Sequence, residues 1–138
     1  MTILDTNVVS EMMRPVPEPV VVRWFASLAP EDTHVTAITV AEIFLGIELL
    51  PVGKRRDLLR AGAERTFAIF TGRVLAFDDK AARAFSLISS KRRRGGRPMS
   101  EFDAQIAAIA KANEALLATR NTDDFEHCGV RLLNPWQA

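Results

Sequence analysis

Acidic side chains recur along the chain at positions where a catalytic site could form. Asp5 directly follows the short apolar segment Thr2-Ile3-Leu4, which is typical of a buried strand. Glu42 lies near the start of a helical segment that follows a second brief strand, and Asp103 lies near the start of another helical segment. If these carboxylates meet, their repulsion raises their pKa values unless a cation neutralises them. The simplest such cation is a divalent metal ion.

The types of the candidate ligands indicate which metal this would be. Carboxylate oxygens favour Mg²⁺ or Mn²⁺ over zinc, which prefers histidine and cysteine ligands. The two histidines, His34 and His127, lack metal-ligand spacing, and Cys128 is the only cysteine. A carboxylate-bound Mg²⁺ keeps several waters, can deliver one as a nucleophile, and stabilises charge that grows on phosphoryl oxygens. We therefore expect hydrolysis of a phosphodiester bond by a metal-activated water.

Each of these acids also has a purely structural explanation. Thr39 and Glu42 match a helix capping box, and Ser100 and Asp103 match its shorter analogue, so both acids could bond the backbone where helices begin. Asp5 could accept hydrogen bonds in an Asx turn. The two roles are compatible, because a helix N-terminus favours the ionised carboxylate that a metal requires.

Strands and helices are predicted to alternate along the chain. Brief apolar or β-branched segments predict strands near residues 2–4, 34–38, 73–77, 115–119 and 130–133. Apolar residues at three- and four-residue steps predict helices over residues 20–28, 39–50, 54–70 and 79–90, and from Ser100 onward. This alternation predicts a parallel sheet with helices on both faces. In such a sheet ligands bind beyond the carboxyl ends of the strands, where the acids are expected.

The composition is that of an ordinary globular protein with one domain over residues 1–138. The chain has 48% hydrophobic residues, and 18 Lys and Arg residues balance 17 Asp and Glu residues. These values exclude disorder of the whole chain, and any affinity for nucleic acid must be local. We expect a cytoplasmic protein, because the sequence shows no secretory signal, no apolar run long enough to span a membrane and no pair of cysteines.

A cluster of basic residues precedes Asp103. Five cations fall within seven residues of a segment predicted to be a loop, residues 91–98: Lys91, Arg92, Arg93, Arg94 and Arg97. If the arginines flank the acidic crevice, they supply the phosphate attraction that the near-neutral protein otherwise lacks. The alternative is a solvated surface connection whose charges only aid solubility.

Four segments also stand out by their order and separation along the chain. They are Ile3 to Glu11, Ala37 to Gly46, Phe102 to Ala110, and Ala118 to Phe125. Together they resemble the four motifs of PIN-domain ribonucleases, and more narrowly those of the VapC and FitB toxins of bacterial toxin–antitoxin pairs. The ending Leu133-Asn134-Pro135-Trp136 is similar to that of the FitB-like branch.

The resemblance has several implications for fold and function. It implies a three-layer α/β/α sandwich with a central, mainly parallel sheet of four to five strands. The implied activity is cleavage of RNA that depends on Mg²⁺ or Mn²⁺. A cognate antitoxin that binds DNA and a homodimer of the chain are also implied.

Matched position by position, the resemblance also implies a set of site residues. Asp5 and Asp103 correspond to the main metal-binding aspartates of the family, and Glu42 corresponds to the third acid. The fourth position, an aspartate in some members, falls on Asn121, which brings no charge and leaves the number of metals open; Asp123 or Asp124 could substitute. The residues expected to support this catalytic set are Thr6, Asn7, Thr119 and Asp124.

Two other functions remain open from the sequence. The chain could be a non-catalytic module that binds RNA or a partner and whose acids only cap helices. It could also be a metal-dependent phosphatase with Asp5 as the nucleophile, although haloacid-dehalogenase phosphatases need a second aspartate two residues later, where this chain has Asn7. Removal of the metal and substitution of Asp5 would separate these functions from a nuclease.

Overall fold

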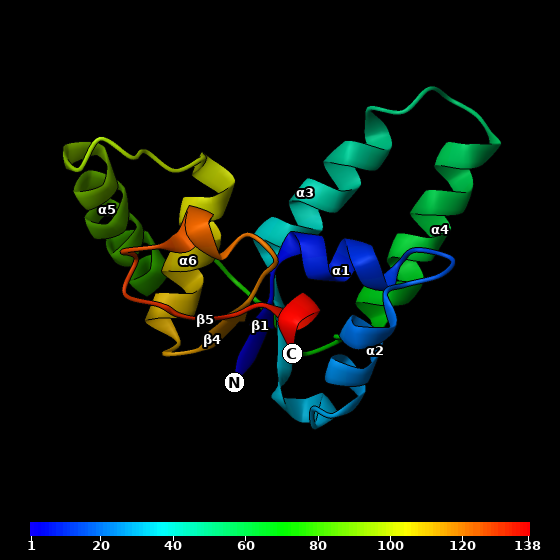
Figure 1. Cartoon of the computed structure of the whole chain (residues 1–138). Coiled ribbons are helices and arrows are strands. Elements are labelled where there is room, and N and C mark those ends of the chain that lie inside the picture. Colours follow the sequence, from blue (N-terminus) through cyan, green and yellow to red (C-terminus); the bar gives the residue numbers. More distant parts are fainter.

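Five parallel strands form one sheet in the order β3-β2-β1-β4-β5 (Figure 1). The strands are β1 (Thr2–Leu4), β2 (Thr33–Thr36), β3 (Val74–Leu75), β4 (Leu116–Ala118) and β5 (Arg131–Leu133). The computed structural model describes all residues from 1 to 138. The prediction of a parallel sheet of four to five strands is therefore confirmed.

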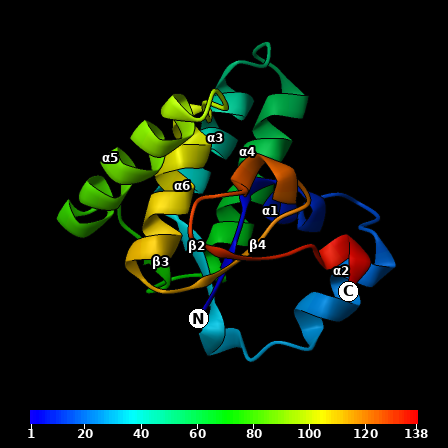
Figure 2. The same ribbon diagram turned by 60° about the vertical axis from the view of Figure 1, so that its left-hand side comes forward.

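Helices cover both faces of this sheet (Figures 1 and 2). They are α1 (Thr6–Met12), α2 (Pro19–Ala26), α3 (Ala37–Glu48), α4 (Lys54–Ala68), α5 (Asp79–Arg94) and α6 (Glu101–Ala112). Three short 3₁₀ helices complete the connections: η1 (Pro30–Asp32), η2 (Thr122–Phe125) and η3 (Pro135–Gln137). The arrangement confirms the α/β/α sandwich. None of the helices combines the length and the apolar character needed to cross a membrane.

The central strand β1 is buried on both faces of the sheet. Successive side chains of a strand point to opposite faces of the sheet. Ile3 enters the core formed with α5 and α6, whereas Leu4 enters the core formed with α1 and α2. Both side chains are buried, so an apolar strand is required at the centre of the sandwich.

The chain leaves β1 and β4 in opposite directions. After β1 it passes through α1 and α2 to β2, on one side, and after β4 it passes through η2 to β5, on the other. The two strands lie next to each other, and the backbone N–H of Asp5 donates to the carbonyl of Ala118 at 2.9 Å. This reversal opens a crevice at the carboxyl ends of β1 and β4.

The start of α3 differs from the sequence prediction. The helix begins at Ala37 instead of Thr39, because Thr36 is its N-cap and the Thr36 hydroxyl accepts from the backbone N–H of Thr39 at 3.1 Å. The capping box predicted for Thr39 and Glu42 is therefore wrong. Glu42 lies in the second turn, where its carboxylate is not used to cap the helix.

Two further predictions about local structure are wrong. Residues 6–12 form the helix α1, where only an acidic turn was predicted, because a helix of seven residues carries too few apolar repeats to be recognised. Residues 91–94 were predicted as a loop but are the last turn of α5. Arginine and lysine favour helices, and their charge is stabilising at a helix C-terminus.

Substitution of two glycines by alanine should change the free energy of unfolding in opposite directions. Gly96 follows Gly95, the C-cap of α5, and has a φ of +73°, which L side chains rarely adopt, whereas Gly46 lies within α3 with open space at the position of a Cβ. We expect Gly96→Ala to lower the free energy of unfolding by about 1 kcal/mol and Gly46→Ala to raise it by about 0.5 kcal/mol. Urea unfolding of both variants measures this. Equal effects of both substitutions would contradict the left-handed conformation of Gly96.

Candidate active site

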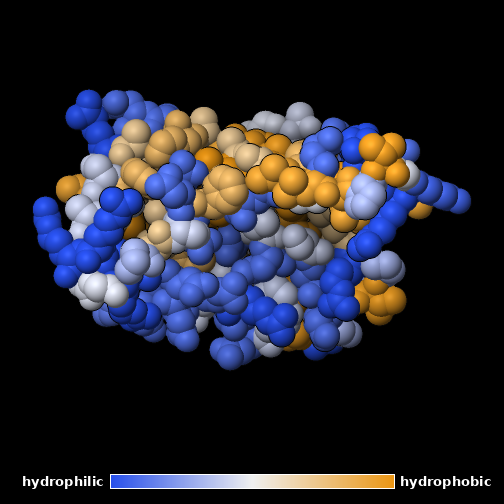
Figure 3. Space-filling model, turned by 90° about the horizontal axis from the view of Figure 1, so that it is seen from above, coloured by the Kyte–Doolittle hydropathy of each residue, from blue (hydrophilic) through white to orange (hydrophobic).

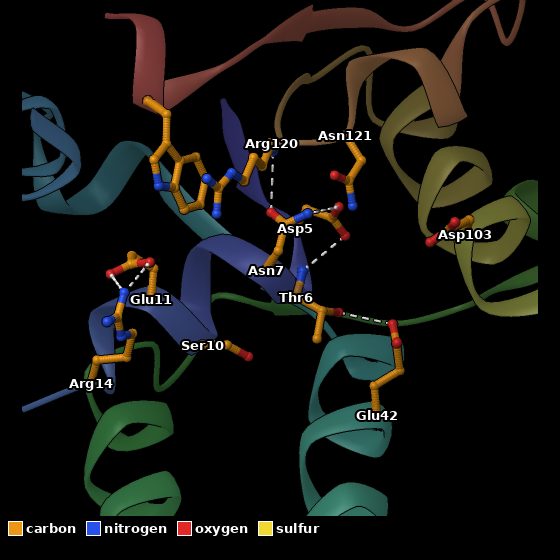
Figure 4. A pocket seen from close by; sticks show the side chains of 11 residues that line it. Asp5, Thr6, Asn7, Ser10, Glu11, Arg14, Glu42, Asp103, Arg120 and Asn121 are labelled. Atoms are coloured by element: carbon orange, nitrogen blue, oxygen red, sulfur yellow. Dashed lines mark hydrogen bonds and ion pairs between the residues drawn. The ribbon is translucent and has the colours of Figure 1, made fainter. Parts of the chain in front are cut away.

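An acidic pocket of about 460 Å³ opens beyond the carboxyl ends of β1 and β4 (Figure 4). Its lining residues are Asp5, Thr6, Asn7, Ser10, Glu11, Arg14, Glu42, Asp103, Arg120, Asn121 and Trp136. The three acids predicted as metal ligands therefore meet in one pocket, although they come from the N-cap of α1, the second turn of α3 and the first turn of α6. Asn121 lines the same pocket, whereas Asp123 and Asp124 do not.

Asp5 is held by three neighbours at the N-terminus of α1. Its Oδ1 accepts from the backbone N–H of Thr6 at 2.8 Å. Its Oδ2 accepts from the hydroxyl of Thr119 at 2.7 Å and from the side-chain amide of Asn7 at 3.3 Å. Three of the four residues predicted to support the site thus contact Asp5 directly, and they fix the direction of its carboxylate.

Burial is the main reason that Asp5 has an unusual pKa. The side chain is only 4% exposed, and loss of water around the charged form raises the pKa of Asp5 from 3.8 to about 6. The hydrogen bonds from Thr119 and Thr6 lower the pKa, and the charges of Asp103 and Glu42 raise it by smaller amounts. The expected repulsion among the acids is present, but it contributes less than burial does.

Glu42 is tied to α1 through a threonine. The Thr6 hydroxyl donates to Glu42 Oε1 at 2.8 Å and lies 2.9 Å from the Thr39 hydroxyl (Figure 4). Partial burial raises the pKa of the Glu42 carboxyl, and the bond from Thr6 opposes that rise. Thr6 therefore positions Glu42 relative to Asp5, which precedes it in the chain.

Asp103 faces the pocket from the first turn of α6 (Figure 4). Ser100 is the N-cap of this helix, and its hydroxyl accepts from the backbone N–H of Asp103 at 3.2 Å. The capping predicted for Ser100 is confirmed, and it leaves the Asp103 carboxylate available to the pocket. Burial is the largest cause of the raised pKa of Asp103; the nearby charge of Asp124 adds to it, and that of Arg92 opposes it.

The donor set suits a hard divalent cation. The pocket offers carboxylate oxygens and the amide oxygen of Asn121, and no histidine or cysteine lines it. No three acidic, histidine or cysteine side chains converge closely enough to hold one ion together. Mg²⁺ needs fewer protein ligands than that, because it is commonly held by one or two carboxylates and keeps several waters. The residues present therefore fit Mg²⁺ or Mn²⁺ better than zinc.

The prediction that Arg92 contacts nucleic acid is wrong. Its side chain is only 6% exposed, and its guanidinium donates to the carbonyls of Arg97, Asp124 and Glu126 at 2.6, 3.0 and 2.8 Å. These bonds satisfy three carbonyls and fasten the end of α5 to η2. Arg92 is therefore a structural residue that turns away from solvent.

The other basic residues of this segment lie outside the pocket. Arg93 and Arg94 are exposed at the end of α5, and Arg97 forms an ion pair with Glu126 at 3.2 Å. Their contact with nucleic acid remains a prediction. Any attraction of phosphate inside the pocket must come from other side chains.

Five of the lining residues were not predicted from the sequence. Glu11 is 6% exposed, accepts from the backbone N–H of Glu18 at 3.1 Å and pairs with Arg14 at 3.0 Å. Ser10, Arg120 and Trp136 complete this group. Arg120 could have been found from its place between Thr119 and Asn121. Nothing in the sequence indicates that Trp136, near the other end of the chain from Asp5, reaches this pocket.

Comparison with known proteins places these features in a wider group. The PIN domain family matches residues 2–130. The chain is 42% identical to the toxin FitB of Neisseria gonorrhoeae over 137 residues and 36% identical to the VapC ribonuclease Y4jK of Sinorhizobium fredii over 138 residues, with 99% of each protein covered in both comparisons. The solved structure of FitAB bound to a DNA fragment matches with a TM-score of 0.89 and 42% identity, over 99% of this chain and 96% of that chain.

The raised pKa of Asp5 predicts how stability depends on pH. A buried acid whose folded pKa of about 6 exceeds its unfolded value of 3.8 stabilises the fold below the unfolded value, and this contribution is lost as the pH rises through about 6. As the pH rises from about 4 to about 7, the free energy of unfolding of Asp5→Asn should therefore increase by about 1–3 kcal/mol relative to that of the natural protein.

Urea unfolding in metal-free buffer at several pH values measures this difference. Asp123→Asn is the matched control, because it removes the same charge at a position that does not line the pocket. A difference between Asp5→Asn and the natural protein that stays constant with pH would contradict the assigned effect of burial.

Proposed function

Because the chain belongs to the PIN domain family, and within it to the VapC and FitB type of toxin, we propose that it is an Mg²⁺- or Mn²⁺-dependent endoribonuclease and the toxin of a toxin–antitoxin pair. The observation that carries this proposal is the meeting of Asp5, Glu42 and Asp103 in one pocket, at the point where the sheet reverses its connections. The related proteins include a ribonuclease by name, and the chain matches it over almost its full length.

Asp5 and Asp103 would hold the cation, with Glu42 as the third acid. A divalent cation in such a site supplies Lewis-acid stabilisation of the charge that develops on phosphoryl oxygens. The hydrogen bonds from Thr6 and Thr119 fix the Asp5 carboxylate before the cation arrives, so less order has to be gained on binding. Asn121 adds an oxygen without a charge, which favours one cation over two.

The chain's own side chains also provide for the attacking water. Glu42 Oε1 accepts from the Thr6 hydroxyl, whereas no protein group donates to Oε2. The free Oε2 can orient a water through a hydrogen bond and accept its proton as the water attacks phosphorus. The bond from phosphorus to the 3′ oxygen breaks in the same step, and the leaving 3′ oxygen takes a proton from solvent. In this scheme Thr6 keeps Glu42 at a set position beside Asp5, so the water that Glu42 orients is held at a fixed place relative to the other carboxylates.

An antitoxin is the protein partner that we propose. An apolar groove of about 420 Å³, whose apolar lining includes Met13, Ile43 and Ile47, adjoins the acidic pocket and shares Thr6 and Glu42 with it. Figure 3 shows apolar side chains gathered in a band on one face of the molecule. Apolar surface of this kind is typical of protein interfaces. The related FitAB is a complex bound to DNA, which supports a DNA-binding antitoxin.

A homodimer is a further part of the proposal. Exposed apolar side chains lie outside this groove on α3, at its C-cap and on α6: Leu45, Leu49 and Phe102. A second copy of the chain would cover part of this surface.

RNA cleavage by the purified chain tests the proposed activity. We expect cleavage of RNA with Mg²⁺ or Mn²⁺ that stops with chelator, and that leaves 5′-phosphate and 3′-hydroxyl ends. Asp5→Asn, Asp103→Asn and Glu42→Gln should each lower kcat by about 100-fold or more, as expected when a group needed in the transition state is removed.

The control is Asp123→Asn, which removes a carboxylate outside the pocket and should cleave like the natural chain. Cleavage that persists in both Asp5→Asn and Asp103→Asn would reject the site. RNA binding that survives chelation in a chain without cleavage would favour the non-catalytic module.

A further inference from the structure

Arg120 is the only cation in the acidic pocket that has no ionic partner. The pocket contains two arginines, and Arg14 is paired with the buried carboxylate of Glu11 at 3.0 Å. The Arg120 guanidinium forms no ion pair and no hydrogen bond, although four carboxylates line the same pocket, and only that of Glu11 is paired with a cation. A flexible arginine would ordinarily turn towards such acids, so its separation from them needs a cause.

The cause is a stack on an aromatic ring. The Arg120 guanidinium carbon lies 5.0 Å from the centre of the Trp136 ring. This is a favourable cation–π distance. Trp136 packs against the core that contains Leu4 and Val8, so the ring is a fixed platform. The stack holds the guanidinium to one side of the pocket, away from the acids.

The backbone of Arg120 is held from two sides. Its N–H donates to Asn7 Oδ1 at 3.2 Å, and its carbonyl accepts from Asn134 Nδ2 at 3.5 Å. Asn134 also accepts from the backbone N–H of Trp136 at 2.9 Å, so one residue links the arginine to its platform. Both the cation and the ring are therefore set in place before any ligand enters.

A stacked guanidinium keeps its N–H groups free at the edge of its plane. Two parallel N–H groups match two phosphate oxygens, which a lysine ammonium cannot do. A polyanion entering this pocket meets four carboxylates, of which only Glu11 is paired with a cation, and the net charge of the whole chain is only +1. Because salt screens charges more than about 8 Å away, distant basic residues contribute little here, and Arg120 inside the pocket offsets part of the repulsion in addition to the divalent cation.

We infer that Arg120, held on Trp136, binds a backbone phosphate of the RNA substrate beside the acid cluster and so positions the scissile bond. This inference rests on the proposed function, since it assigns the substrate contact of the same pocket. Arg120 takes no part in bond cleavage. Its role is to bind one phosphate, so that the next phosphodiester lies against Asp5, Glu42 and Asp103.

The test compares Arg120→Ala with Arg120→Lys and with the control Arg131→Ala, which removes an exposed arginine outside the pocket. With a single-stranded RNA oligonucleotide, Arg120→Ala should lower kcat/KM by about 10-fold or more, mostly through KM. The kcat/KM of Arg120→Lys should lie between that of Arg120→Ala and that of the natural chain, because lysine keeps the charge but loses the paired contact. The kcat/KM of Trp136→Phe should also lie between these two values, because a phenyl ring binds the guanidinium more weakly than an indole ring does.

Salt dependence separates a phosphate contact from a structural role. Loss of one contact should reduce the slope of log(kcat/KM) against log salt concentration by about 0.7, whereas Arg131→Ala should leave it unchanged. Thermal unfolding should show the same midpoint for Arg120→Ala and Arg131→Ala. Equal KM and equal salt slope for these two variants would overturn the inference.

RNA binding without metal distinguishes failure of the inference from failure of the proposed function. Fluorescence anisotropy of the same oligonucleotide in chelator measures binding alone. Binding that depends on Arg120 in a chain that never cleaves would support the phosphate contact and reject the nuclease. Cleavage by Arg120→Ala equal to that of the natural chain would support the nuclease and reject the phosphate contact. Absence of both binding and cleavage would overturn both.

Discussion

The burial of the Asp5 carboxylate is the constraint on which the rest of the site depends. A charged group at the centre of a sandwich costs free energy unless hydrogen bonds replace its water. Thr6 and Thr119 supply such bonds from α1 and from the end of β4, and the pKa of about 6 shows that they do so only in part. A bound cation would compensate the remaining cost of the buried charge, which is why we propose one at this pocket.

The sequence predicted those parts of the site that depend on residues close together in the chain. Asp5 was predictable because a carboxylate directly after a buried apolar strand is unusual, and the alternation of elements predicted the sheet. Glu42 was predicted as a site residue although the start of its helix was predicted wrongly. Thr36 and Thr39 are the same residue type, so the sequence did not show which of them caps the helix. The helix α1 was missed because seven residues give little periodicity.

Contacts between distant segments were beyond the reach of the sequence. Arg92 and Arg120 are the same residue type, yet one is buried and the other exposed. The carbonyls of Asp124 and Glu126 draw Arg92 inward, and the Trp136 ring draws Arg120 to the pocket. Each outcome depends on which acceptors or rings tertiary packing brings within reach, so a run of positive charge did not identify the arginine that lines the acidic pocket.

Asn7 shows why an amide, and not a second aspartate, occupies the position two residues after Asp5. Its Nδ2 donates to Asp5 Oδ2 and lies 3.3 Å from the Thr119 hydroxyl, while its Oδ1 accepts from the backbone N–H of Arg120. A carboxylate could accept from Arg120 but could not donate to Asp5, and its charge would oppose that of Asp5. The amide therefore positions both Asp5 and the backbone of Arg120, which argues against a phosphatase built on paired aspartates.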